Sequence, residues 1–455
     1  MAKVAVTYGL WLIQDDNMKE AFVLKGKWWT PAYPDNVITG DMNFDPSKGA
    51  ILNLGGMLRE SDTCAIPFKI VLGETVDGRA ITLIGSSGIW LEHPYRIVDD
   101  GEPDVPTCSA LCADVLVIGK HYGSQEEIEF KGLTIDLSYL TDWVKGMEPG
   151  PAPSLPRALA LDCDIGVIGK LIIGSEGDGS CRLTMDLNNE IGLDQGIEMV
   201  RQLRNLMALF MHRSTHEVRV WGAVGRGADD DGSKMKVEVF YPSFANDREA
   251  NPLELEDMLL PLSSIGADMG NMVSKWFAIN ENMTQVLDLY FAASQSAELF
   301  QATRFLMYMQ AIEAYHRHRY RNFEVEPEEH RRRVAVILES IPEQYREWMR
   351  DGLEYSNEPS HGQRLKEIYD DLRETMDEFV DDRKKFVFQL TRTRNHLTHL
   401  EGNGDDMVLK GSDLVLATMR LRLMLELCLL KELGIERDRM RNAVMRNTMF
   451  SQIRI

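Results

Sequence analysis

The stretch QVLDLYFAASQSAELFQATRFLMYMQAIEAYHRHRY, residues 285–320, decides how the second part of the chain folds. Its apolar residues recur at the 3.6-residue spacing of an amphipathic helix, which predicts one long helix or two abutting ones. The same spacing continues through several later segments. We expect further helices at approximately 328–341, 342–355, 361–380, 382–400, 412–433 and 436–452. Residues 281–455 are therefore predicted to form an all-α bundle.

The residues before this stretch follow a different pattern. They form short segments rich in Val, Ile, Thr and aromatic residues, separated by Gly, Asp, Asn and Pro, as strands are. TVDGRAITLI, residues 75–84, places Asp-Gly between two apolar runs and predicts a hairpin. Helical spacing is seen in SLPRALALD, residues 154–162, and in IGLDQGIEMVRQLRNLMALFMH, residues 191–212. We expect an α+β fold, with an antiparallel β-rich domain over 1–280 and the helical bundle over 281–455.

Composition limits the class of protein. The chain has 455 residues, of which 44% are hydrophobic and 27% charged, as in a folded protein of two or three domains. The sequence shows no apolar run near the roughly 20 residues that a membrane span needs and no signal-peptide pattern, so we expect a cytoplasmic protein without a membrane partner. GAVGRGADDDG, residues 222–232, precedes a strand pattern rather than a helix, which favours a hairpin loop over a phosphate site. We expect no cofactor.

Charge is distributed unevenly along the chain. Residues 1–280 hold 24 Lys and Arg against 41 Asp and Glu, whereas residues 281–455 hold 26 against 30. The total of −21 argues against a protein that coats nucleic acid nonspecifically, because phosphates would be repelled. Basic clusters remain at 317–321, 331–333 and 383–385 and leave room for a local basic cleft. Each cluster is more often a solvated helix face balanced by neighbouring acids.

The segment TRTRNHLTHL, residues 391–400, is unusually polar for a helix that also carries an apolar stripe. The stripe is expected to be buried, and its members are Phe386, Leu390, Thr393, Leu397 and Leu400. Beside it, one face of the helix collects Arg392, Asn395, His396 and His399. The solvent-exposed face of a helix usually consists of Glu and Lys. A polar seam satisfied within the bundle and a functional site both stay open. Other histidines, His361 among them, have no partner at ligand spacing and are expected to be surface or satisfied core residues.

These residue types suit one kind of chemistry. Histidine can accept and return a proton near neutral pH, and arginine offers paired donors to phosphate oxygens. Together they could cleave a phosphodiester of RNA, in which the 2′-OH is the nucleophile and no metal is needed. HLTH, residues 396–399, lacks the glutamate and the spacing of a HExxH zinc site. We therefore expect no metal.

RNHLTH, Arg394 to His399, resembles the R-(N/D/H)-x-x-x-H form of the Rx4-6H motif of HEPN-superfamily ribonucleases. With QATRFLMYMQAIEAYHRHR and EEHRRRVAVIL, it resembles the ApeA-like HEPN domain. GLWLI, IVLGETVDGRAITLI and IEFKGLTIDLSYLTDW resemble the N-terminal domain of ApeA-type anti-phage defence proteins. The resemblance implies a metal-independent endoribonuclease that leaves a 2′,3′-cyclic phosphate and acts in abortive infection when a phage is sensed. Structured transfer RNA would suit an acidic, selective enzyme.

The resemblance also implies roles for single residues. The family's arginine corresponds to Arg394, its polar neighbour to Asn395 and its histidine to His399. On an ideal helix Arg394 lies about 140° from His399, whereas Arg392 shares the face of His399. Three explanations of this separation stay open: the helix is distorted near its end, the long side chain of Arg394 reaches round, or Arg392 contributes instead. Arg392 and His396 are therefore secondary candidates. HEPN nucleases are similar in pairing two bundles, so one histidine in each copy would serve as base or acid, which predicts a homodimer.

Two other readings remain. In the first, the HEPN bundle has no nuclease activity and dimerises or binds RNA within a defence complex. In the second, the β-rich part is the active element, for example a sugar- or nucleotide-binding enzyme. The second predicts that residues 1–280 alone retain activity.

Overall fold

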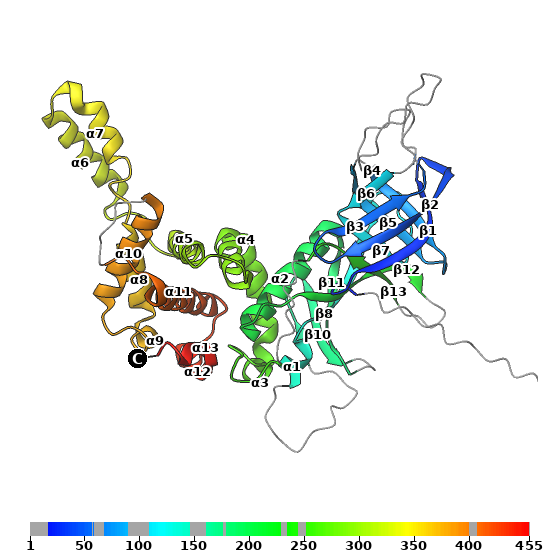
Figure 1. Ribbon diagram of the computed structural model, residues 1–455. Coiled ribbons are helices and arrows are strands. Elements are labelled where there is room, and N and C mark those ends of the chain that lie inside the picture. The colour runs from blue at the N-terminus through cyan, green and yellow to red at the C-terminus, as the bar shows by residue number, and fades with distance from the viewer. Residues whose placement is uncertain are drawn as a thin grey trace, which may run out of the picture. The chain divides into compact units, whose positions relative to one another are not determined.

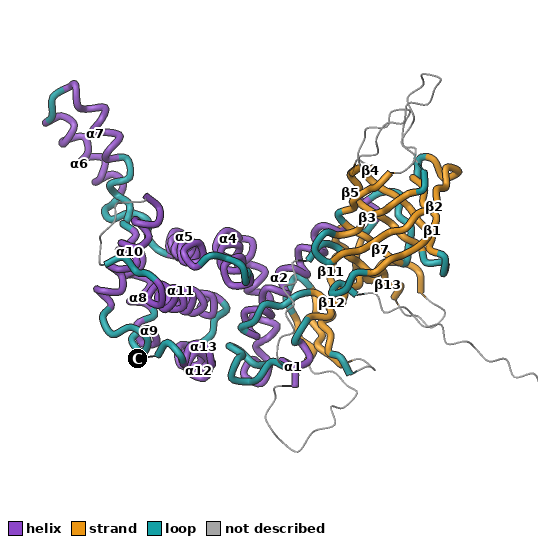
Figure 2. The backbone as a smooth tube through the Cα atoms, in the orientation of Figure 1, coloured by secondary structure: helices purple, strands orange, loops and turns teal. Residues whose placement is uncertain are grey.

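The computed structural model describes residues 17–56, 58, 68–89, 109–145, 161–175, 179–228, 234–243, 252–399 and 407–454 (Figure 1). The chain forms two compact units. Within the described residues, the first unit draws on Met1–Thr141, Gly150–Arg204 and Thr215–Glu249, and the second on Asp142–Pro149, Asn205–Ser214 and Ala250–Ile455. The predicted α+β class is confirmed, because the first unit is a large antiparallel sheet and the second is helical (Figure 2).

Thirteen strands of the described residues pair in one antiparallel sheet. They are β1 Phe22–Thr30, β2 Tyr33–Asp45, β3 Gly49–Leu54, β4 Phe68–Thr75, β5 Ala80–Ile89, β6 Ser109–Ala113, β7 Val115–Ile118, β8 Glu129–Leu137, β9 Leu161–Asp164, β10 Gly169–Ser175, β11 Cys181–Gly192, β12 Glu217–Ala228 and β13 Lys234–Phe240. Their order is β4-β1-β2-β3-β6-β5-β7-β13-β12-β8-β11-β10-β9, with a further pairing of β4 with β5. That pairing closes β4, β1, β2, β3, β6 and β5 into a ring, which removes the exposed edges that an open sheet would have there.

The inside of the ring is filled by aromatic and branched side chains. Trp28 is 0% exposed, and its indole N–H donates to the carbonyl of Gly40 at 3.0 Å. The ring of Trp28 lies directly over Gly73, where an added Cβ would come within 2.3 Å of it. Phe22 and Phe44 stack at 5.1 Å between ring centroids. A well-packed barrel wall of this kind explains why Gly73 carries no side chain.

Local sequence signals in the first unit had mixed outcomes. The Asp-Gly hairpin is confirmed: Gly78 has a φ of +85°, its N–H donates to the carbonyl of Thr75 at 2.9 Å, and β4 pairs with β5. The helix expected over 154–162 is wrong where it can be seen, since Leu161 begins β9, and residues 154–160 lie outside the described residues. The segment GLWLI also lies outside the described residues. For the hairpin expected around residues 222–232, the structure shows that β12 and β13 pair antiparallel, and residues 229–233 between them lie outside the described residues.

The helices run as follows: α1 Leu140–Lys145, α2 Leu193–Met211, α3 Leu262–Ile265, α4 Met269–Gln295, α5 Gln301–Arg319, α6 Pro327–Ser340, α7 Arg346–Leu353, α8 His361–Asp371, α9 Arg373–Met376, α10 Arg383–His399, α11 Gly411–Glu432, α12 Arg437–Arg446 and α13 Thr448–Ser451. Short 3-10 turns are η1 Gln125–Glu127, η2 Gly266–Asp268 and η3 Glu343–Tyr345. In the described ranges no helix is long and apolar enough to cross a membrane.

The helical part begins earlier than its periodicity suggested. Residues 285–320 form two helices, the end of α4 and all of α5, and α4 starts at Met269. Met269, Met272 and Trp276 recur on one face of α4 and are buried, so flexible methionine side chains supply the apolar face there. The expected division between residues 280 and 281 falls inside α4, close to a kink at Met283, and stays a prediction.

Two parts of the bundle differ strongly in burial. The first is α11, which packs against α4, α5 and α12 and is buried almost all round from Leu421 to Leu430. The second is the α6–α7 hairpin, residues 327–353. No side chain of α6, η3 or α7 is buried by the part of the chain that the structure describes, and Val336 and Trp348 are 67% and 71% exposed.

Candidate active site on helix α10

Helix α10 is fixed in the bundle by the stripe that its sequence predicts. Phe386, Leu390 and Thr393 are buried, Leu397 is half-buried, and Leu400 lies outside the described residues. The hydroxyl of Thr393 accepts a hydrogen bond from the backbone N–H of Leu409 at 3.0 Å. The chain that leads into α11 is thereby held against the last turns of α10, so the polar segment stands on a well-anchored helix.

The five predicted site residues all lie on the last two and a half turns of α10. Arg392 and His399 are exposed, whereas Arg394, Asn395 and His396 are half-buried. The imidazole of His399 therefore stands in a position that a ligand can reach. A seam satisfied entirely within the bundle would have buried it.

The helix continues without interruption to His399, and the hydroxyl of Thr398 donates to the carbonyl of Arg394 at 2.8 Å, one turn back. Arg394 and His399 thus leave the helix about 140° apart. However, Nη1 of Arg394 donates to Oδ1 of Asn395 at 3.3 Å. Asn395 is one turn before His399 and shares its face, so this hydrogen bond draws the guanidinium round toward the histidine. The choice among the three explanations left open by the sequence stays a prediction.

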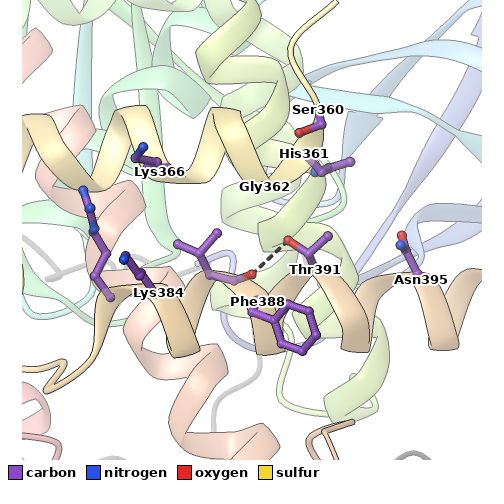
Figure 3. Close-up of a pocket in the computed structure, with 10 residues that line it drawn as sticks. Ser360, His361, Gly362, Lys366, Lys384, Phe388, Thr391 and Asn395 are labelled. Atoms are coloured by element: carbon purple, nitrogen blue, oxygen red, sulfur yellow. Dashed lines mark hydrogen bonds between the residues drawn. The ribbon is translucent and has the colours of Figure 1, made fainter.

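A pocket of about 580 Å³ lies between α8 and α10 (Figure 3). His361 and Lys366 of α8 line it together with the N-cap residue Ser360, and Lys384, Phe388 and Asn395 line it from α10. Figure 3 shows the two lysines at one end of the pocket and Ser360, His361 and Asn395 at the other. Asn395 thus belongs both to the pocket and to the predicted motif.

The charge around the pocket comes partly from the basic cluster at 383–385. Lys384 and Lys366 are exposed, while Arg383 is paired with Asp370. In the cluster at 331–333, Arg333 is likewise paired with Glu329. Basic clusters on helices are usually balanced by neighbouring acidic residues in this way.

His361 is a site residue that the sequence did not reveal. Its Nε2 lies 2.5 Å from Oε2 of Glu313 on α5. The close contact with His361 is the main reason that the pKa of Glu313 falls to about 2, and Arg317 lowers it further, against the opposing effect of burial. Because Glu313 is far upstream in the sequence, local spacing contains no sign of this pair. His361 also forms one wall of the pocket, and its Nε2 lies against the Glu313 carboxylate without an aligned hydrogen bond.

Behind that wall, α8 is locked to α5 by a buried arginine. The guanidinium of Arg364 donates to Nδ1 of His316 at 2.9 Å and to Oδ1 of Asn322 at 2.6 Å. A guanidinium can only donate, so Nδ1 of His316 is the acceptor and its Nε2–H donates to Glu367 at 2.7 Å. Burial lowers the pKa of His316, and the charge of Arg364 lowers it further. His316 is therefore a neutral residue that fixes the position of α8.

Among the residues that the structure describes, no three His, Cys, Asp or Glu side chains are grouped as ligands for a metal ion.

Two family models match the chain. The model described as Apea-like HEPN matches residues 306–439, which include α8, α10 and the motif. The model described as ApeA N-terminal domain 1 matches residues 24–155 and 180–276, which include most of the sheet. No curated protein and no solved structure matches the chain.

Proposed function

Because the chain belongs to the ApeA-type HEPN proteins of anti-phage defence, we propose that it is a metal-independent endoribonuclease whose reaction takes place at Arg394, Asn395 and His399. HEPN domains generally act on RNA and dimerise. The observation that carries the proposal is the exposure of His399, one turn beyond a pocket residue and on the face toward which Arg394 is drawn.

The proposed reaction balances without an external nucleophile. His399 removes the proton of the 2′-OH, the 2′ oxygen bonds to the phosphorus, and the bond to the 5′ oxygen breaks. A second imidazole returns a proton to the departing 5′ oxygen. The products are a 2′,3′-cyclic phosphate and a 5′-OH end. The guanidinium of Arg394 stabilises the charge on the non-bridging oxygens, and Asn395 holds that guanidinium in place.

The second imidazole comes from a second copy of the chain. The attacking and departing oxygens lie on opposite sides of the phosphorus, so a base and an acid must approach from opposite sides. A two-fold homodimer through the HEPN bundle would bring His399 of each copy to one scissile phosphate. Arg392 and His396 are secondary candidates on the neighbouring face.

The biological setting forms the rest of the proposal. We assign the β-rich domain the role of a sensor for a phage-derived trigger, and the bundle the role of a nuclease in abortive infection in the cytoplasm. A structured target such as transfer RNA suits a chain with a net charge of −21, because phosphate is attracted at the local basic cleft and repelled elsewhere.

The test compares the wild-type protein with His399→Ala and with His318→Ala. His318 is an exposed histidine in the last turn of α5 and serves as the matched control. Each full-length protein is incubated with total bacterial RNA and EDTA, and the fragment ends are mapped. We expect cyclic-phosphate ends from the wild type and the control, and none from His399→Ala. Unchanged cutting by His399→Ala would remove His399 from the mechanism, and loss of cutting with EDTA would contradict metal independence.

The alternative function is a bundle that dimerises or holds RNA without cutting it. The basic pocket beside the motif would serve such a module equally well. Phage challenge of cells separates the two functions. If His399→Ala cells keep full protection, the bundle acts without catalysis; if protection is lost while the control keeps it, the nuclease is required.

A further inference from the structure

We propose that the pocket between α8 and α10 is a nucleotide subsite, which receives one unpaired base of the RNA next to the scissile phosphate. The inference rests on the proposed function and adds the form of its substrate: looped or single-stranded RNA rather than a duplex. It is carried by the side chains that line the pocket and by the path from them to His399.

The pocket side of α10 is a continuous stripe. Lys384, Phe388, Thr391 and Asn395 are spaced 4, 3 and 4 residues apart, which keeps them within about 60° of one another on a helix. His399 is the next residue along this stripe, one turn beyond Asn395. A strand that enters the pocket at Lys384 and follows the stripe therefore arrives at the imidazole.

Phe388 is the side chain on which a base would stack. Phe388 is 55% exposed and lines the pocket, whereas Phe386, two residues earlier, is buried in the core. The core thus does not need Phe388. Every nucleobase has a flat π face, and stacking on an aromatic ring is a common way for proteins to hold single-stranded nucleic acid without reading its sequence.

The pocket also has the charge that a phosphodiester strand requires. Lys366 on α8 and Lys384 on α10 are both exposed and stand at the same end of the pocket (Figure 3). Two ammonium groups at one end suit the phosphate of a nucleotide whose base stacks on Phe388. Asn395 at the other end presents an amide that can hydrogen-bond to a base or to a sugar hydroxyl.

A base can enter this pocket only after it leaves its stack. Bases in a duplex have both faces covered and their edges paired, whereas loops and bulges present bases that can be splayed out. The subsite therefore predicts that the enzyme chooses loops of structured RNA. The same geometry rejects intact duplex without any contact to a particular sequence.

The test uses full-length His399→Ala protein, which is expected to bind RNA without cutting it. A labelled RNA hairpin with an unpaired loop and a blunt RNA duplex of equal length are titrated at fixed salt. We expect tighter binding of the hairpin. In the His399→Ala protein, a second substitution Phe388→Ala should weaken hairpin binding about fivefold or more, and Phe388→Trp in its place should keep the affinity of the His399→Ala protein. Phe300→Ala, at an 83% exposed phenylalanine outside the pocket, is the matched control and should change nothing.

Charge reversal gives a second readout. Lys384→Glu should weaken binding and reduce the dependence of affinity on salt, since one phosphate contact is lost. Equal affinity of hairpin and duplex, or hairpin binding unchanged by Phe388→Ala, would overturn the subsite. Neither result depends on cleavage. If the wild type cuts no RNA while Phe388 still governs loop binding, the nuclease proposal fails and the subsite stands.

Discussion

Nε2 of His212 lies 3.1 Å from a carboxylate oxygen of Glu426, and the two side chains are 2% and 0% exposed. His212 follows α2, and Glu426 is in the middle of α11. Asn447 donates to Nδ1 of His212 at 3.0 Å, so Nε2, which faces the carboxylate, carries the hydrogen. The other oxygen of Glu426 accepts from Tyr290 at 2.7 Å and from Arg422 at 2.6 Å. Four distant segments of the second unit are thus joined: His212 and Tyr290 contact Glu426 of α11, and Asn447 is linked to it through His212.

Replacing Glu426 by Gln should lower the free energy of unfolding by about 3–5 kcal/mol, because Arg422 would stay in the interior without a charged partner. Urea unfolding of the full chain measures this loss. Glu347→Gln on α7 is the matched control at an exposed position and should stay within about 0.5 kcal/mol of wild type. A loss below about 1 kcal/mol for Glu426→Gln would mean that the carboxylate is not the stabilising centre of the junction.

Stability should fall as the pH drops below about 6.5, the ordinary value for histidine. Burial lowers the pKa of both His212 and His316 in the folded chain. Between the lowered pKa and about 6.5 the unfolded chain binds protons that the folded chain excludes, so the full stability is present above this range and is lost as the pH falls through it. Each histidine contributes a slope of up to about 1.4 kcal/mol per pH unit.

Unfolding curves recorded from pH 7.5 to pH 5 test this prediction. His316→Gln should flatten the slope relative to wild type, whereas His318→Ala, at an exposed position, should leave it unchanged. A slope that is equal in all three proteins would show that His316 is not held neutral by Arg364.

The two arginines of the motif region can be told apart by kinetics. If Arg394 stabilises the transition state, Arg394→Ala should lower kcat/KM about 100-fold or more, and Arg392→Ala only a few-fold. Asn395→Ala should fall between them, because it releases the guanidinium of Arg394 without removing it. The opposite order of the two arginine variants would assign the role to Arg392, which shares the face of His399.

Gly73→Ala should destabilise the sheet by about 1–3 kcal/mol, since the new methyl group would overlap the ring of Trp28. Gly174 on β10 is the matched control, because a Cβ added there meets no atom of the described residues within 4 Å. Thermal unfolding of Gly73→Ala and Gly174→Ala compares them. Equal stability of the two variants would show that Trp28 can move aside.

The features that the sequence predicted correctly depend on neighbours in the chain. An Asp-Gly turn needs four residues, and the stripe of Phe386, Leu390 and Thr393 needs one helix. Both signals are complete within a short window. The helical part was expected to start too late, because the apolar face at the beginning of α4 consists largely of methionines among small residues, which give a weak periodic signal.

The features that escaped prediction are contacts between distant residues. His316 and Glu367 are 51 positions apart, and the ring of the sheet closes only because β1 pairs with β4, which places Gly26 opposite Thr75. Packing decides which of many possible partners meet, and one sequence does not contain that information. The pocket beside Asn395 belongs to the same class, since part of its wall comes from α8.

The α6–α7 hairpin has a different relation to the rest of the second unit. Asn357 joins its two ends, donating to the carbonyl of Val325 at 2.9 Å and accepting from the N–H of Val325 at 3.0 Å. A short turn could therefore replace everything between these residues without opening the helices that hold the motif. Changes of length or sequence within residues 327–353 are therefore expected to leave the positions of α8 and α10 unchanged.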